Sequence, residues 1–231
     1  MTDTTAPYGT PEHPRVAVRG EASLEVDPEI AHLGITVTAR GKDRHTALED
    51  LTRRNGTVLE LIRSYGPAVE KLETGALSIN PELAGKGRDE KIRAYHGRVH
   101  ITAVLNDFTA LGELVTRVAA LDMTRVNGPW WALRPDSPAH ANARRQAVRE
   151  AVQRAREYAD ALGSHLTALV ELADLGAENV APALPAPSAG FRGSAGYGAA
   201  AAPPPALDLE PRRQTVYAQV NARFIMSPPE L

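Results

Sequence analysis

Histidine and arginine alternate along one short stretch of the chain, at His96, Arg98 and His100. Imidazole is a common metal ligand, and charged imidazolium and guanidinium groups bind phosphate, so this stretch could do chemistry. If it is a strand, the three side chains share a face, but His96 and His100 lie about 13 Å apart, too far to hold one ion together. The pattern therefore favours the exposed polar face of a strand over a metal site.

Two other stretches resemble functional loops only in part. The run from Gly85 to Arg88 lacks the Gly-x4-Gly-Lys-Ser/Thr spacing of a phosphate-binding loop and favours a solvated hairpin tip. Ser194 follows Arg-Gly, so the first glycine of a Gly-x-Ser-x-Gly elbow is missing. The chain has no cysteine, which excludes disulfides, thiol catalysis and cysteine-based metal sites. We therefore expect a protein that is not an enzyme, with no catalytic, cofactor-binding or metal-binding residue.

The adjacent tryptophans Trp130 and Trp131 are better candidates for a contact site. Neighbouring side chains on a strand point to opposite faces, so we expect one indole in the core and the other elsewhere. An exposed indole either anchors a subunit interface or lies beneath a long loop, and the sequence leaves both possibilities open. Phe191 and Tyr197, isolated in an Ala/Gly/Pro-rich stretch, are further candidate anchors for a second subunit or another protein.

Arginines crowd one predicted helix, beginning with Arg144 and Arg145. Acidic residues alternate with them, which favours ion pairs on a solvated face over a nucleic-acid site. In an oligomer the same charges could cross an interface, so both arginines are candidate interface residues. The net charge of -2 likewise predicts no nucleic-acid partner.

The first residues of the chain are polar and rich in proline, without the apolar run that a secretory signal peptide needs. No stretch of about 18 apolar residues occurs elsewhere, so no transmembrane segment is expected. We therefore expect a cytoplasmic protein. An exported protein whose signal peptide had been trimmed would show the same sequence.

Hydrophobic periodicity predicts the elements that would position these residues. Seven strands are predicted, at 16–26, 33–39, 72–80, 95–105, 126–133, 166–175 and 215–225. Apolar and polar residues alternate in the first, second, fourth and last of them. Apolar residues three and four apart predict helices at 43–65, 108–121 and 138–162, the last with a buried stripe of alanines that includes Tyr158. The first two strands, joined by Asp27-Pro28, are expected to form an antiparallel hairpin, and residues 81–93 a solvated hairpin loop.

These elements predict an α+β fold, with an antiparallel or mixed sheet and helices packed on one face in two layers. A single domain is expected at 15–226, between a disordered segment at 1–14 and a tail at 227–231. Its composition at about 180–206 is rich in Ala, Pro and Gly, which predicts a low-complexity insertion, either a flexible loop or a projecting arm.

In this order the elements resemble the SIMPL-domain (DUF541) family over nearly the whole chain. The opening stretch RVAVRGEASLEVDPEIAHLGITV is similar to the family's first two strands, with its Pro-acidic-x-Ala turn at Pro28, Glu29 and Ala31. Further along, the resemblance is carried by the Tyr95 strand that leads to Asn106-Asp107-Phe108, by Ala143-Arg144, by alanines at 147, 151, 155 and 159, and by Ala161-Leu162-Gly163. The chain departs from the family pattern at Ala94, Val99 and Thr124.

The resemblance implies a protein similar to bacterial periplasmic and outer-membrane-associated antigens. It implies a homo-oligomer, ring-, channel- or cage-like, with a link to stress tolerance. The alternative is a monomer or small oligomer that binds a ligand or another protein in a stress response.

Overall fold

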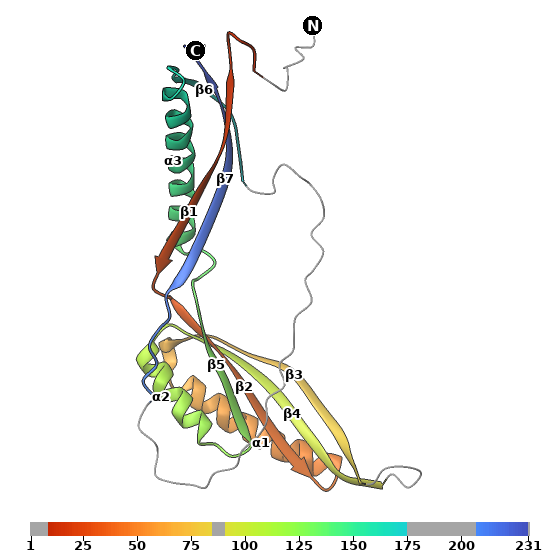
Figure 1. Ribbon diagram of the computed structural model, residues 1–231. Coiled ribbons are helices and arrows are strands. Elements are labelled where there is room, and N and C mark those ends of the chain that lie inside the picture. Colours follow the sequence, from red (N-terminus) through yellow and green to blue (C-terminus); the bar gives the residue numbers. More distant parts are fainter. Residues whose placement is uncertain (1–8, 85–90, 175–206, 231) are drawn as a thin grey trace. The chain divides into compact units, whose positions relative to one another are not determined.

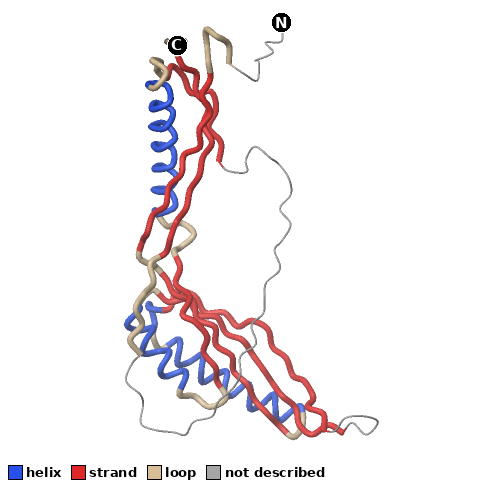
Figure 2. Tube along the Cα trace, in the orientation of Figure 1, coloured by secondary structure: helices blue, strands red, loops and turns tan. Residues whose placement is uncertain are grey.

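The structure is a computed structural model that describes residues 9–84, 91–174 and 207–230. Its helices and strands form an α+β fold with antiparallel sheets, as predicted (Figure 2). Contacts group the described residues into two compact units rather than around one sheet. The predicted single domain at 15–226 stays a prediction.

The first unit combines a three-stranded sheet with one long helix (Figure 1). Its sheet has the order β1 (Arg15–Val26), β7 (Gln214–Met226) and β6 (Leu166–Asp174), and α3 (Pro138–Asp160) packs mainly on β1. The Ser137 hydroxyl accepts a hydrogen bond from the Ala139 N–H at 3.3 Å. This cap begins the helix where the Ser-Pro pair predicts it.

Small residues allow α3 to approach β1 closely. The helix buries one alanine per turn, at Ala139, Ala143, Ala147, Ala151, Ala155 and Ala159. On β1, a Cβ at Gly20 would lie only 2.0 Å from the Ala147 carbonyl oxygen and 2.6 Å from the Ala151 nitrogen. Backbone therefore packs against backbone at this point, and glycine is the residue that the space allows.

The second unit combines a four-stranded sheet with two helices on one face (Figure 1). The strand order is β3 (Val69–Ala84), β4 (Lys91–Leu105), β2 (Ile30–Gly41) and β5 (Thr124–Ala132). Helices α1 (Arg44–Arg63) and α2 (Phe108–Ala119) cover the sheet, with a 3-10 turn η1 at Gly66–Ala68 after α1.

Alternate residues of β2 and β4 form the core of the second unit beneath the two helices. The largest side chains buried there are Leu33, Ile35, Leu51, Ile62, Ile101, Leu105, Leu111 and Leu114. Asp107 caps α2 as predicted, because its Oδ1 accepts hydrogen bonds from Thr109 N–H at 2.9 Å and Ala110 N–H at 3.0 Å. Asp43 caps α1 in the same way, through Thr46 N–H at 2.8 Å.

The predicted hairpin between the first two strands is wrong. β1 pairs with β7, whereas β2 pairs with β4 and β5, so the strands on either side of Asp27-Pro28 belong to different sheets. Periodicity identifies each strand but says nothing about its partner. The partner of β1 comes from the other end of the chain.

Smaller differences concern the ends of elements and one helix face. β3 extends to Ala84 and β4 begins at Lys91, so part of the predicted loop at 81–93 is strand. Tyr158 is 55% exposed, because the alanine stripe lies on another side of the helix and is the part that faces β1. The predicted insertion at 180–206 lies outside the described residues.

Candidate binding face

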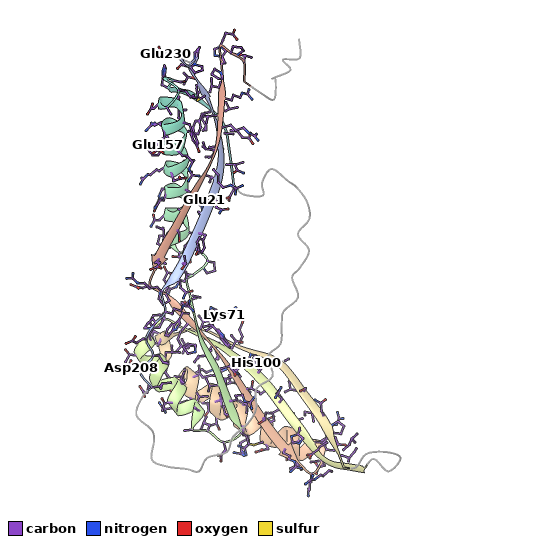
Figure 3. The ribbon with its side chains drawn as sticks, viewed as in Figure 1. Glu21, Lys71, His100, Glu157, Asp208 and Glu230 are labelled. Atoms are coloured by element: carbon purple, nitrogen blue, oxygen red, sulfur yellow. The ribbon has the colours of Figure 1, made fainter. Side chains whose placement is uncertain are left out.

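One face of the second unit's sheet points away from α1 and α2, and we call it the open face. Because Val99 and Ile101 are buried beneath the helices, the alternate residues of β4 lie on the open face. The residues of its two central strands are His32, Gly34, Thr36, Thr38 and Arg40 of β2 and His96, Arg98, His100, Thr102 and Val104 of β4. The predicted common face of His96, Arg98 and His100 is therefore confirmed, and Figure 3 labels His100 on β4.

Trp130 of β5 lies over Gly34 on the open face. A Cβ at Gly34 would stand 3.3 Å from Cη2 and Cζ3 of Trp130 and 3.2 Å from Cε1 of His100. The missing side chain of Gly34 thus leaves room for the indole and the imidazole next to each other above β2. Because Trp130 is 55% exposed, its indole forms an apolar shelf that is open to solvent.

Trp131 lies on the opposite side of β5, as alternation predicts. It packs against the core of the second unit, and its ring meets that of Phe108 edge to face, with centroids 4.8 Å apart and an interplanar angle of 77°. The structure therefore divides the two roles that the sequence left unassigned: Trp131 joins the core and Trp130 lies at the surface. That Trp130 anchors an interface stays a prediction.

Replacing Trp131 with alanine should destabilise the second unit by about 2–3 kcal/mol, because it removes a large, partly buried aromatic from the core. Replacing Trp130 with alanine should cost less than about 1 kcal/mol, because that residue is exposed. Urea denaturation of the two variants, followed by circular dichroism, measures both values. Equal destabilisation by the two changes would contradict the assignment.

Carboxylates on the open face are paired with cations. Glu82 accepts a hydrogen bond from Arg40 Nη2 at 2.7 Å, and its Oε2 lies 2.8 Å from His96 Nε2. The hydrogen bond with His96 has the largest effect on the pKa of Glu82, and the one from Arg40 the next largest. Both lower this pKa below its usual value. On β3, Glu73 lies 2.8 Å from the Nζ of Lys71, which Figure 3 labels.

Two arginines of this sheet are not paired with a described carboxylate. Arg98 on β4 and Arg125 on β5 form no ion pair with any of the described residues. Thr36 of β2 stands opposite both Arg125 and His100, and its Oγ1 lies 3.4 Å from His100 Nδ1. Together these side chains make a positive, hydroxyl-bearing patch beside the Trp130 shelf. Among the residues that the structure describes, no three His, Asp or Glu side chains gather where they could hold a metal ion.

A second polar cluster ties together the ends of β2, β3 and β5. Glu29, the acidic residue of the turn before β2, accepts a hydrogen bond from the Arg134 N–H at 3.0 Å. Glu70 of β3 accepts hydrogen bonds from the Arg134 guanidinium and from Asn106 Nδ2, the latter at 2.9 Å. Each partner fixes the end of an element, so the cluster's role is structural. Sequence analysis missed it because its members lie far apart in the chain.

Acid should weaken this cluster. Hydrogen bonds from Arg134 first and Asn106 second lower the pKa of Glu70 below the 4.5 of an unperturbed glutamate. The stabilisation is therefore complete above pH 4.5 and is lost as the pH falls through the lower folded-state pKa. Glu70→Gln should lower stability at pH 7 and flatten its acid dependence, as measured by urea denaturation between pH 7 and pH 3. An unchanged pH profile in the variant would contradict this role.

The other predicted interface residues do not contribute to the open face. Arg144 and Arg145 are exposed on α3 in the first unit, where Arg145 donates a hydrogen bond to Asn142. The predicted ion pairing along this helix is present, with Arg154 and Glu150 2.5 Å apart. Phe191 and Tyr197 lie outside the described residues. None of the described helices is long and apolar enough to cross a membrane.

Comparison with known proteins identifies relatives along most of the chain. It is 27% identical over 225 residues to the 26 kDa periplasmic immunogenic protein of Brucella melitensis, which covers 93% of this chain and 86% of that protein. It is 21% identical over 154 residues to the uncharacterized protein YggE of Edwardsiella ictaluri, covering 66% and 64% of the two chains. A solved structure of a putative amidohydrolase/peptidase from Burkholderia cenocepacia, 16% identical, covers 58% of this chain and 33% of that chain. Its TM-score of 0.26 is too low to carry an argument.

These relatives correct the predicted location. The proteins from Brucella melitensis and Brucella abortus are both named periplasmic, so the expectation of a cytoplasmic protein is wrong. That expectation was drawn from the polar residues at the start of the chain, which do not determine where the protein works.

The family model that matches this chain is described as SIMPL, a protein of unknown function (DUF541), and it spans residues 16–224. Neither this description nor the names of the Brucella relatives indicate an enzymatic activity. The match includes strands of both units and all three helices. The chain therefore belongs to the SIMPL (DUF541) family.

Proposed function

We propose that this chain is a non-enzymatic SIMPL protein that assembles with copies of itself in the periplasm. The observation that carries the proposal is the apolar edge of the first unit's sheet, at β6. The names of the Brucella relatives support the location. A link to stress tolerance and a second protein partner remain predictions.

β6 is an edge strand with apolar side chains turned to solvent. In the order β1, β7, β6, no described strand pairs with its outer side. Leu169 is 56% exposed, Val170 40% and Leu172 47%. Proteins usually protect such an edge with charges or proline, because its free N–H and C=O groups pair readily with another strand. The only charged groups on β6 are Glu171, already paired with Arg223, and Asp174.

A groove beside this edge explains why Leu169 is exposed. Leu169 and Leu172 stand opposite Phe224 and Ala222 of β7, whose side chains belong to the core under α3. Because α3 packs mainly on β1, no described helix covers the part of the same face over β6. The result is a groove of about 460 Å³ whose lining includes Val152 and Leu169. A second copy would cover it.

The charges on the rim of the groove favour the same occupant. Arg156 and Asp160 of α3 line it, and neither forms an ion pair with a described residue. If two copies pair β6 to β6 about a twofold axis, the same surface meets itself, so each copy brings the opposite charges of Arg156 and Asp160 to the shared interface. A single sheet would then continue through both copies.

Two substitutions on β6 test the proposal directly. Leu169→Lys combined with Leu172→Lys places two charges in the interface, where they would be desolvated without partners, so the assembly should separate into smaller species. Gel filtration with light scattering measures the mass. The matched control is Tyr217→Lys on β7, which places a charge at an apolar residue that is 74% exposed and should leave the mass unchanged.

A charge exchange tests the pairing itself. Arg156→Asp should weaken the assembly, because two acidic residues would then meet across the axis. Adding Asp160→Arg to that variant should restore it, because the pair is rebuilt in reverse. If the β6 variant keeps the wild-type mass, or if the control loses it equally, this edge is not the assembly surface.

A further inference from the structure

The open face of the second unit combines an aromatic shelf with an uncompensated positive patch. The shelf is Trp130, 55% exposed, which lies over Gly34 and beside His100. The patch contains Arg98 and Arg125. Neither feature belongs to the proposed assembly surface on β6.

The shelf suits the apolar face of a ring. An exposed indole presents a π surface on which the C–H groups of a sugar ring stack, while polar groups around it take up the sugar's hydroxyls. Gly34 keeps the shelf in place, because any side chain there would meet the indole and the His100 ring at 3.2–3.3 Å and push them outward. Thr36 and Thr102 place hydroxyl groups on the same face.

The patch suits an anionic group on that ring. β4 and β5 flank β2, and Arg98 stands opposite Thr38 whereas Arg125 stands opposite Thr36. Two strand spacings and an offset of two residues place the two arginine backbones about 12 Å apart, within reach of one anion between their long side chains. Thr36 of β2 stands opposite Arg125 in this gap. Guanidinium groups bind carboxylate, sulfate and phosphate with paired hydrogen bonds. The acids of this face, Glu73 and Glu82, do not compete, because each is already paired with cations.

We propose that the open face binds an acidic carbohydrate, with a sugar ring on Trp130 and its anionic group held by Arg98 and Arg125. A simple anion would make no use of the shelf, and a neutral sugar would make no use of the arginines. Nucleic acid would need a longer cationic track, and the chain's net charge of -2 opposes it.

Calorimetric titration of the full chain with a trimer of galacturonic acid tests the proposal. The expected result is saturable binding at low salt. A neutral galactose trimer and inorganic sulfate should each bind at least about tenfold more weakly, because each lacks one of the two contacts. No saturable binding of the acidic trimer, or equal affinity for sulfate, would overturn the proposal.

Variants locate the site. Trp130→Ala and the double variant Arg98→Gln with Arg125→Gln should each weaken binding of the trimer by about tenfold or more. The matched control, Arg144→Gln with Arg145→Gln, removes the same two charges from α3 and should change the affinity less than about twofold. An equal loss in that control would mean nonspecific attraction. If Trp130→Ala keeps the affinity but lowers the mass in light scattering, a second copy covers the shelf and the proposal is wrong.

Discussion

Replacing Gly20 with alanine is expected to destabilise the first unit by about 3 kcal/mol, near the upper end for overpacked cores. The new Cβ would lie 2.0 Å from the Ala147 carbonyl oxygen and 2.6 Å from the Ala151 nitrogen. Both are backbone atoms of α3, so no change of side-chain rotamer relieves the clash. The helix must move away from β1, which separates the alanine stripe from the strand. Urea denaturation followed by circular dichroism measures the loss.

A neighbouring residue on the same strand provides the control. Ala17 is exposed on β1, on the side away from α3, so Ala17→Val should change stability by less than about 0.5 kcal/mol. Wild-type stability in Gly20→Ala would mean that α3 and β1 do not pack as closely as described.

Replacing Leu33 with alanine is expected to destabilise the second unit by about 3–4 kcal/mol, as for other fully buried leucines. Leu33 is 0% exposed and lies on β2, between its sheet neighbours and the helices. The change removes its apolar contacts and leaves a cavity that the surrounding strands cannot fill. Tryptophan fluorescence during urea denaturation reports the loss, because Trp131 packs on the same core and Trp130 lies on the same sheet.

Leu77 is the matched control, because it lies on β3 of the same sheet and is 57% exposed. Leu77→Ala should cost less than about 1 kcal/mol. If the two leucine variants lose the same stability, burial does not distinguish them and the described core is wrong.

Local patterns in the sequence were sufficient to find the elements. Apolar and turn-forming residues located the strands that the structure describes, and the apolar spacing and caps located the described helices, because these signals depend on residues a few positions apart. Strand pairing depends on residues far apart in sequence. The local sequence around Asp27-Pro28 therefore predicts a hairpin, although β1 pairs with β7 from the other end of the chain.

Some features of the candidate site follow from local sequence patterns, and others depend on strand pairing. Alternation along β4 was enough to place His96, Arg98 and His100 on one face. The position of Trp130 over Gly34, and of Arg125 opposite Thr36, depends on the register between β2 and β5, including its irregularity between His32 and Gly34. Alternation predicts that the side chains of Trp130 and Trp131 point to opposite faces of β5. It does not predict which of the two is buried in the core, because that depends on the face against which the helices pack.

The mass of the wild-type chain in solution tests the central claim most directly. Gel filtration with light scattering at micromolar concentration should give a discrete multiple of 24.8 kDa, the mass of one chain. A multiple that falls when Leu169 and Leu172 become lysines would place the contact at β6. A single species of 24.8 kDa over the whole concentration range would contradict self-assembly.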